Sequence, residues 1–157
     1  MRTRLIAVVS IAVLLVGGGS AAGASVSSFT KKSACDLISE DDVTGIFGEA
    51  PTQTTEDGKK GKFTTCTWMV PTPEGSSATV FIGIDKPNAL NKKDFKGNSK
   101  SSTAEKVAGI KKGFIDGITV TFIQNGNFVN VQYLAATGEA TNTDGLIALA
   151  KALYKKL

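Results

Sequence analysis

Histidine is absent from this chain of 157 residues, and its two arginines, Arg2 and Arg4, both lie at the amino end. Without histidine, catalytic triads and metal sites that depend on an imidazole are excluded. After Arg4, no arginine is available to clamp a phosphate group. The glycines do not form a phosphate-binding loop either, because none has the required spacing to a following lysine. We therefore expect no metal and no cofactor.

The first residues have the order of a secretory signal peptide. Arg2 and Arg4 precede an uncharged apolar run from Leu5 to Val16, and small residues continue to Ala24. The run has 12 residues, whereas a helix that spans a membrane needs roughly 20. We therefore expect a signal peptide at residues 1–24 and no stable transmembrane span, with a retained anchor as the alternative.

The remaining 133 residues are weakly charged, with 16 lysines against 14 acidic residues and a net charge of +2. This length suits one domain with a single core. The low net charge and the expected export both argue against a nucleic-acid partner. We expect a flexible lead-in at residues 25–34, a single domain at 35–157, and a secreted or extracytoplasmic location in the cell envelope.

Cysteine is scarce, and both cysteines, Cys35 and Cys66, lie in the expected domain. An even number of cysteines in an exported chain predicts a disulfide. Closing a loop of about 30 residues would stabilise the domain by roughly 3.5 kcal/mol. A metal site is the alternative, but two thiolates without histidine are a poor set of ligands.

Two neighbouring segments predict a short helix and a strand pair. Residues 38–48 read as a helix that is capped by Ser39, with Asp42 at the capping-box position. Residues 52–62 are polar and predict an exposed loop. Alternation in residues 63–70 predicts a strand with Cys66, Trp68 and Val70 on the buried face and its threonines on the other, antiparallel to a second strand at 78–84.

Residues 86–112 contain eight lysines and two acidic residues. We expect a partly helical crossover followed by a mobile loop. The apolar residues available to anchor it are Leu90, Phe95, Val107 and Ile110. The lysines could contact anionic envelope polymers or lipid headgroups, although solvated lysines are the commoner case. The candidates for this basic contact are Lys92, Lys93, Lys96 and Lys100.

The dipeptide Asn125-Gly126 suits the two positive φ angles of a type I′ hairpin turn. Counting outward from the turn pairs Phe122 with Val129, Val120 with Val131, and Ile118 with Tyr133 on an apolar face. The opposite face is polar and would meet water or a partner. Its residues form the candidate binding face: Thr119, Thr121, Asn130 and Gln132.

Residues 141–157 predict an amphipathic carboxy-terminal helix that covers the apolar face of the sheet. Taken together, the elements predict one α+β domain. It would contain a mostly antiparallel sheet of about four to five strands, packed by a short amino-terminal helix and the carboxy-terminal helix, with one disulfide.

Three features occur together in this domain. Cys35-Asp36-Leu37-Ile38-Ser39 leads into the acidic helix that ends at Phe47-Gly48, Cys66-Thr67-Trp68 lies in a strand, and a Leu/Ala/Lys helix ends the chain. Together they resemble the domain of unknown function 3558 family of secreted actinobacterial envelope proteins. The resemblance implies an α+β domain with a Cys35–Cys66 bridge and no established activity. The cysteine that would carry a lipid anchor directly after the signal is missing here.

These patterns favour an exported, non-catalytic domain that binds an envelope component, a protein partner or a small ligand. One alternative is an extracellular hydrolase that uses carboxylates or a Ser102–Lys106 dyad, which helical spacing could bring together. Another alternative is a sensor or inhibitor domain that acts on a second exported protein.

Overall fold

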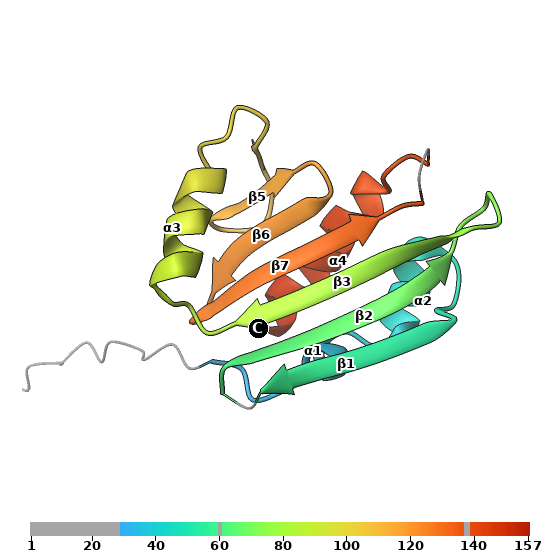
Figure 1. Cartoon of the computed structure of the whole chain (residues 1–157), viewed down its shortest axis with the longest axis horizontal. Helices are drawn as coiled ribbons and strands as arrows, with labels where there is room; N and C mark the ends of the chain where they lie inside the picture. The colour runs from blue at the N-terminus through green and yellow to red at the C-terminus, as the bar shows by residue number, and fades with distance from the viewer. Residues whose placement is uncertain (1–28, 60, 137–138) are drawn as a thin grey trace, which may run out of the picture.

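A computed structural model describes residues 29–59, 61–136 and 139–157 of the chain (Figure 1). The expected signal peptide and the first residues of the expected lead-in lie outside this part. No helix among the described residues is long and apolar enough to cross a membrane.

The described residues form a seven-stranded sheet in which every neighbouring pair of strands is antiparallel. Across the sheet the order is β1-β2-β3-β7-β6-β5-β4. The strands are β1 (Gln53–Lys59), β2 (Phe63–Pro71), β3 (Ser77–Asp85), β4 (Glu105–Lys106), β5 (Gly113–Asp116), β6 (Thr119–Gln124) and β7 (Asn127–Leu134). The prediction of a single α+β domain is confirmed, whereas the predicted number of strands is too low.

Three of the four described helices lie on one face of the sheet, behind it in Figure 1. They are α1 (Ala34–Leu37), α2 (Glu40–Phe47) and α4 (Thr143–Lys156). The core lies between these helices and the sheet, where the alternating residues of β2, β3, β6 and β7 meet the apolar stripe of α4. Its largest members, all with less than 2% of their surface exposed, include Trp68, Ile82, Phe122, Leu149 and Leu153.

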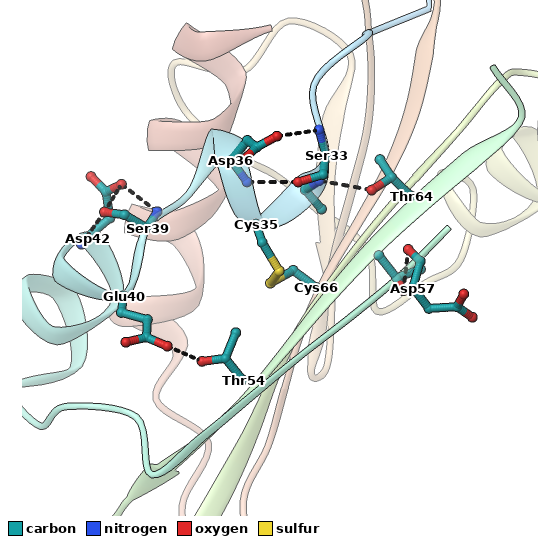
Figure 2. The surroundings of a disulfide bond; sticks show 12 residues. Ser33, Cys35, Asp36, Ser39, Glu40, Asp42, Thr54, Asp57, Thr64 and Cys66 are labelled. Carbon is teal, nitrogen blue, oxygen red and sulfur yellow. Dashed lines mark hydrogen bonds between the residues drawn. A yellow bond between two sulfur atoms is a disulfide. The ribbon is translucent and has the colours of Figure 1, made fainter. Parts of the chain in front are cut away.

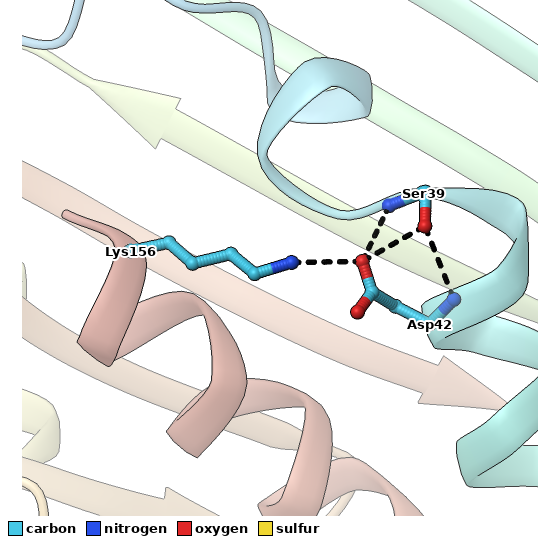
Figure 3. Close-up of polar contacts among 3 residues, drawn as sticks. All are labelled: Ser39, Asp42 and Lys156. Atoms are coloured by element: carbon cyan, nitrogen blue, oxygen red, sulfur yellow. Dashed lines mark hydrogen bonds and ion pairs between the residues drawn. The ribbon is translucent and has the colours of Figure 1, made fainter.

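Helix α2 has the predicted capping box. The backbone N–H of Asp42 donates to Ser39 Oγ over 3.2 Å, and the N–H of Ser39 donates to Asp42 Oδ2 over 2.9 Å. Lys156, at the end of α4, donates from Nζ to the same Asp42 oxygen over 2.8 Å (Figure 3). The carboxylate of Asp42 therefore caps the first turn of α2 and also connects this helix to the last turn of α4.

The exposed loop predicted at residues 52–62 is wrong, because most of this segment is strand β1. It pairs with β2 from Gln53 opposite Met69 to Lys59 opposite Phe63. All seven side chains of β1 are exposed, so the strand has no apolar alternation that could reveal it. Hydrogen bonds between the backbones stabilise this edge strand without any burial of its side chains.

In β2, the predicted burial of Cys66, Trp68 and Val70 is confirmed. The placement of the threonines needs one correction, because Thr64 lies on the buried face with 7% of its surface exposed. Its hydroxyl accepts a hydrogen bond from the N–H of Ala34 over 2.9 Å. A buried threonine is tolerated here because it satisfies the first N–H of α1.

The lysine-rich segment 86–112 contains helix α3 (Ala89–Asn98), and the residues after it include the short strand β4. Val107 and Ile110 anchor this segment as predicted, with 4% and 6% of their surface exposed. Leu90 is not an anchor, since 71% of its surface is exposed. Phe95 is an anchor as predicted, because its ring packs against the buried Phe114 and Phe128.

The β6–β7 hairpin has the predicted turn and register. Asn125 and Gly126 have φ angles of 45° and 75°, and Phe122 pairs with Val129 and Val120 with Val131. Ile118 lies beside Tyr133, whose N–H donates to the Ile118 carbonyl over 3.1 Å. However, 39% of the Ile118 surface is exposed, so the predicted pair with Tyr133 lies at the margin of the core.

The predicted disulfide joins Cys35 in α1 to Cys66 in β2 (Figure 2). The two Cα atoms are 5.2 Å apart, across a sequence separation of 31 residues. Cys66 is fully buried, so the bond attaches the amino-terminal segment directly to the core.

Replacing both cysteines by alanine should lower the free energy of unfolding by roughly 3.5 kcal/mol, because the unfolded chain loses its cross-link. Urea denaturation of the oxidised protein and of the double variant measures the difference. Wild-type protein treated with a reductant is the control and should resemble the variant. Equal stability of the oxidised and reduced forms would contradict the stabilising role.

Asp42→Asn should lower the free energy of unfolding by about 0.5–1 kcal/mol near neutral pH, since the ion pair with Lys156 is partly exposed. The hydrogen bond from Lys156 and the capping bonds from Ser39 lower the pKa of Asp42 below its usual 3.8. The contribution should therefore be complete above pH 3.8 and disappear as the pH falls through the lowered pKa. Asp41→Asn is the control: it keeps Asp42 and its partners, so denaturation curves at a series of pH values should show the same loss of stability at low pH as the wild-type protein.

Candidate functional site

The four residues of the predicted polar face do lie together on the sheet. Thr119 pairs with Gln132 and Thr121 with Asn130, on the face opposite to α1, α2 and α4. Thr121 is 4% exposed, and its hydroxyl donates to Asn130 Oδ1 over 2.9 Å. Thr119 and Gln132 are half-buried. Thr121 and Asn130 therefore hydrogen-bond to each other. Thr119 and Gln132 are the pair that we take as accessible to a partner.

The same surface continues across the other strands of the sheet. One row runs from Gln53 through Met69 and Thr79 to Leu134, and the next runs from Thr55 through Thr67 and Phe81 to Gln132 and Thr119. We call these nine residues the open face: Gln53, Thr55, Thr67, Met69, Thr79, Phe81, Thr119, Gln132 and Leu134. None of these nine is charged, and Asp116 of β5 borders them beside Thr119.

The open face has an apolar centre. Met69 and Leu134 lie directly opposite Thr79 on its two sides, and 37% and 41% of their surfaces are exposed. Among the described residues, no helix lies over this part of the sheet, which faces the viewer in Figure 1. Sequence reasoning missed these two residues, although Phe81 on the threonine side of β3 was a signal that this face is not simply polar.

The ring of Phe81 lies along β3 over Gly83. A β-carbon at Gly83 would come within 3.0 Å of Cε1 of that ring. The glycine therefore lets the aromatic ring lie down against the sheet, where it is half-buried. The centre of the open face therefore includes an aromatic ring beside Met69 and Leu134.

Helix α3 packs against the same side of the sheet, at one end. Phe95 is its contact, with ring centroids 5.1 Å from Phe114 and 6.4 Å from Phe128. Asp85 lies beside this cluster, between Phe63 and Phe128 in the register. Burial raises the pKa of the Asp85 carboxyl.

The predicted basic contact is on the exposed surface of this end. Lys92, Lys93 and Lys96 belong to α3, Lys100 follows it, and all four are exposed. In the described parts of the chain they make no ion pair. They do not line the cleft beside the β1–β2 hairpin, so the structure groups them on one helix without forming a concave site there.

That cleft lies between residues 29–33 and the β1–β2 hairpin and has a volume of about 1070 Å³. Phe29 and Phe63 form its apolar part, and two acidic residues, Glu56 and Asp57, line it on the β1 side. Its basic residues are Lys31, Lys32, Lys59 and Lys86. Sequence reasoning missed this basic cleft because its lysines come from three separate segments and carry no common motif.

Ser102 and Lys106, the dyad predicted for the alternative of a hydrolase, are not brought together by helical spacing. Helix α3 ends at Asn98, and Lys106 lies in β4, so Ser102 and Lys106 do not share a helix. Both are exposed, and no hydrogen bond joins them in the described region. Across the described residues, no group of three or more Cys, Asp or Glu side chains is arranged to hold a metal ion.

The carboxylate of Glu139 lies beside two hydroxyl groups, those of Thr72 and Ser76. Ser76 and Thr72 both donate to Glu139 Oε1, Thr72 over 3.2 Å, and the two hydroxyls are 3.0 Å apart. With both hydroxyls engaged, this contact fastens the segment before α4 to the β2–β3 turn.

Comparisons with protein-family models, with curated proteins and with solved structures find no match to this chain. The resemblance to the domain of unknown function 3558 family therefore stays a prediction. The described domain has two candidate binding surfaces, the open face and the basic cleft.

Asp85→Asn should raise the free energy of unfolding at neutral pH, because the folded protein disfavours the buried charge. The pKa of Asp85 is higher in the folded protein than the value of 3.8 in the unfolded chain. The stability of the wild-type protein should therefore fall as the pH rises from 3.8 through the folded pKa. The gain from the variant should therefore vanish below pH 3.8. Urea denaturation at several pH values tests this, with the exposed Asp94→Asn as control. A variant less stable than wild type at neutral pH would contradict the expectation.

Proposed function

We propose that this chain is exported and forms a non-catalytic domain that binds another protein of the cell envelope through the open face. The observation that carries the proposal is the uncharged, helix-free sheet surface around Thr79, with Met69 and Leu134 exposed beside it. Large apolar side chains grouped on an exposed surface are typical of interaction sites.

The chemistry of the open face favours a protein surface as its ligand. Interface centres are depleted of charge and enriched in methionine and aromatic residues, with polar groups around them. Here Met69, Phe81 and Leu134 have that role, and the surrounding threonine and glutamine side chains supply hydrogen-bond donors and acceptors. An anionic polymer would find no positive charge on these nine residues.

Three observations support a non-catalytic role. The chain has no histidine, its cysteines are joined in a disulfide and supply no thiol, and Ser102 is not held beside Lys106 by a helix. Neither the cleft at the β1–β2 hairpin nor the smaller one at Asn125 and Gly126 is lined by a residue of the open face. Binding without reaction is the function that fits these residues best.

An envelope location is supported by the disulfide and by the amino-terminal sequence. Disulfides persist in oxidising compartments outside the cytoplasm. The order of Arg2, Arg4, the apolar run and the small residues before Ser25 is that of a signal for export. The partner is then a protein that the chain meets after export.

A photoreactive residue, p-benzoylphenylalanine, placed at Thr79 in the full chain tests this proposal in the cells that produce it. Irradiation should join the chain to one distinct partner protein. Leu134→Lys in the same chain should reduce the adduct at least tenfold, because an unpaired lysine in the contact costs more than about 1.4 kcal/mol.

Leu90→Lys is the matched control, since Leu90 is exposed on α3 and is not part of the open face. Thermal melts should show both lysine variants folded. An adduct that Leu134→Lys leaves unchanged, an adduct made only of two copies of this chain, or no adduct at all would each contradict the proposal.

A further inference from the structure

The basic cleft is built from residues that the fold holds in place. The N–H of Thr30 donates to Asn127 Oδ1 over 2.9 Å, and the N–H of Ala34 donates to Thr64 Oγ1 over 2.9 Å. Lys31 and Lys32 lie between these two anchors. Asn127 is 1% exposed, so the first anchor belongs to the buried end of the hairpin. The wall that carries these two lysines is therefore fixed to the sheet at both ends.

The opposite wall carries lysines from two other segments. Lys59 ends β1, and Lys86 follows β3. The N–H of Lys86 donates to the Lys62 carbonyl over 2.8 Å, which connects the end of β3 to the β1–β2 hairpin. Backbone pairing therefore brings these lysines to the same end of the sheet as residues 29–33. Figure 1 shows the β1–β2 hairpin beside this amino-terminal segment, which is blue.

The charge of the cleft is not balanced by ion pairs. Four lysines line it against Glu56 and Asp57, and in the described portion of the chain none of these lysines makes an ion pair. Asp57 Oδ1 instead accepts from the N–H of Gly58 over 2.6 Å. Four lysines against two carboxylates give the lining of this cleft a positive net charge, which favours the entry of an anion.

The cleft also has an apolar part. Phe29 packs against the core cluster from one side, and the half-buried Phe63 begins β2 on the other. A simple inorganic anion would leave both rings without a ligand contact. A molecule that joins an anionic group to an apolar group would use the lysines and the rings together.

We propose that the basic cleft binds an anionic amphiphile, with its charged group held by Lys31, Lys32, Lys59 and Lys86 and its apolar part against Phe29 and Phe63. This site is separate from the open face, shares no residue with it, and does not depend on the proposed protein partner. An anionic phospholipid and a fatty-acid anion have the required chemistry in common.

Isothermal titration calorimetry tests this with the processed protein purified after expression of the full chain. The probes are dihexanoyl phosphatidylglycerol and octanoate, each below its critical micelle concentration. Controls are dihexanoyl phosphatidylcholine, which has no net charge, and inorganic phosphate, which has no apolar part. At least one anionic amphiphile should bind saturably, and at least tenfold more tightly than both controls. The stronger of the two identifies the source.

The double variant Lys59→Glu/Lys86→Glu should weaken that binding at least tenfold and should leave the thermal melt cooperative. Lys92→Glu/Lys96→Glu is the matched control, because it changes the net charge equally on exposed positions of α3. Saturable binding by neither amphiphile, equally tight binding of phosphate, or equal losses in the two double variants would overturn the proposal.

Discussion

The bond between Cys35 and Cys66 is the constraint on which the amino-terminal half of the domain depends. Helix α1 has only four residues, too few to be stable without tertiary support. The disulfide and the hydrogen bond from Ala34 to Thr64 hold it on β2, as Figure 2 shows. From this point the chain extends in one direction into α2 and in the other into the wall of the basic cleft. One cross-link thus positions both the helical cover of the core and a candidate binding site.

The sheet is packed unequally on its two faces. On the face that α1, α2 and α4 cover, apolar residues of five strands are buried, whereas α3 touches the other face through Phe95. Burial of one face is sufficient for an antiparallel sheet, because its second face can remain in contact with solvent. The residues on that second face are therefore free from the demands of the core, and their mixture of threonine, methionine, phenylalanine and leucine needs another explanation. Contact with a partner is the explanation that we propose.

Features determined by neighbouring residues could be predicted from the sequence. The capping box of Ser39 and Asp42 and the turn at Asn125-Gly126 each depend on local chemistry, and the turn also sets the register of Thr119 and Gln132. Strand β1 could not be predicted, because it is held by backbone pairing with β2 and its exposed side chains show no pattern. The basic cleft was missed for a related reason: its lysines become neighbours only after β1, β2 and β3 have paired. The open face could be predicted only in part. The position of Thr119 and Gln132 follows from the hairpin turn, whereas Met69 joins this face through the pairing of β2 with β3.

The two outer strands of the sheet, β1 and β4, protect the domain from aggregation in different ways. An unpaired strand edge can recruit a strand from another chain, and proteins limit this by short or charged edges. Strand β4 has two residues and offers little length for such pairing. Strand β1 has seven, and its side chains include Glu56, Asp57 and Lys59. Charges at these positions disfavour the addition of a further strand, which is consistent with the absence of apolar side chains from this exposed strand.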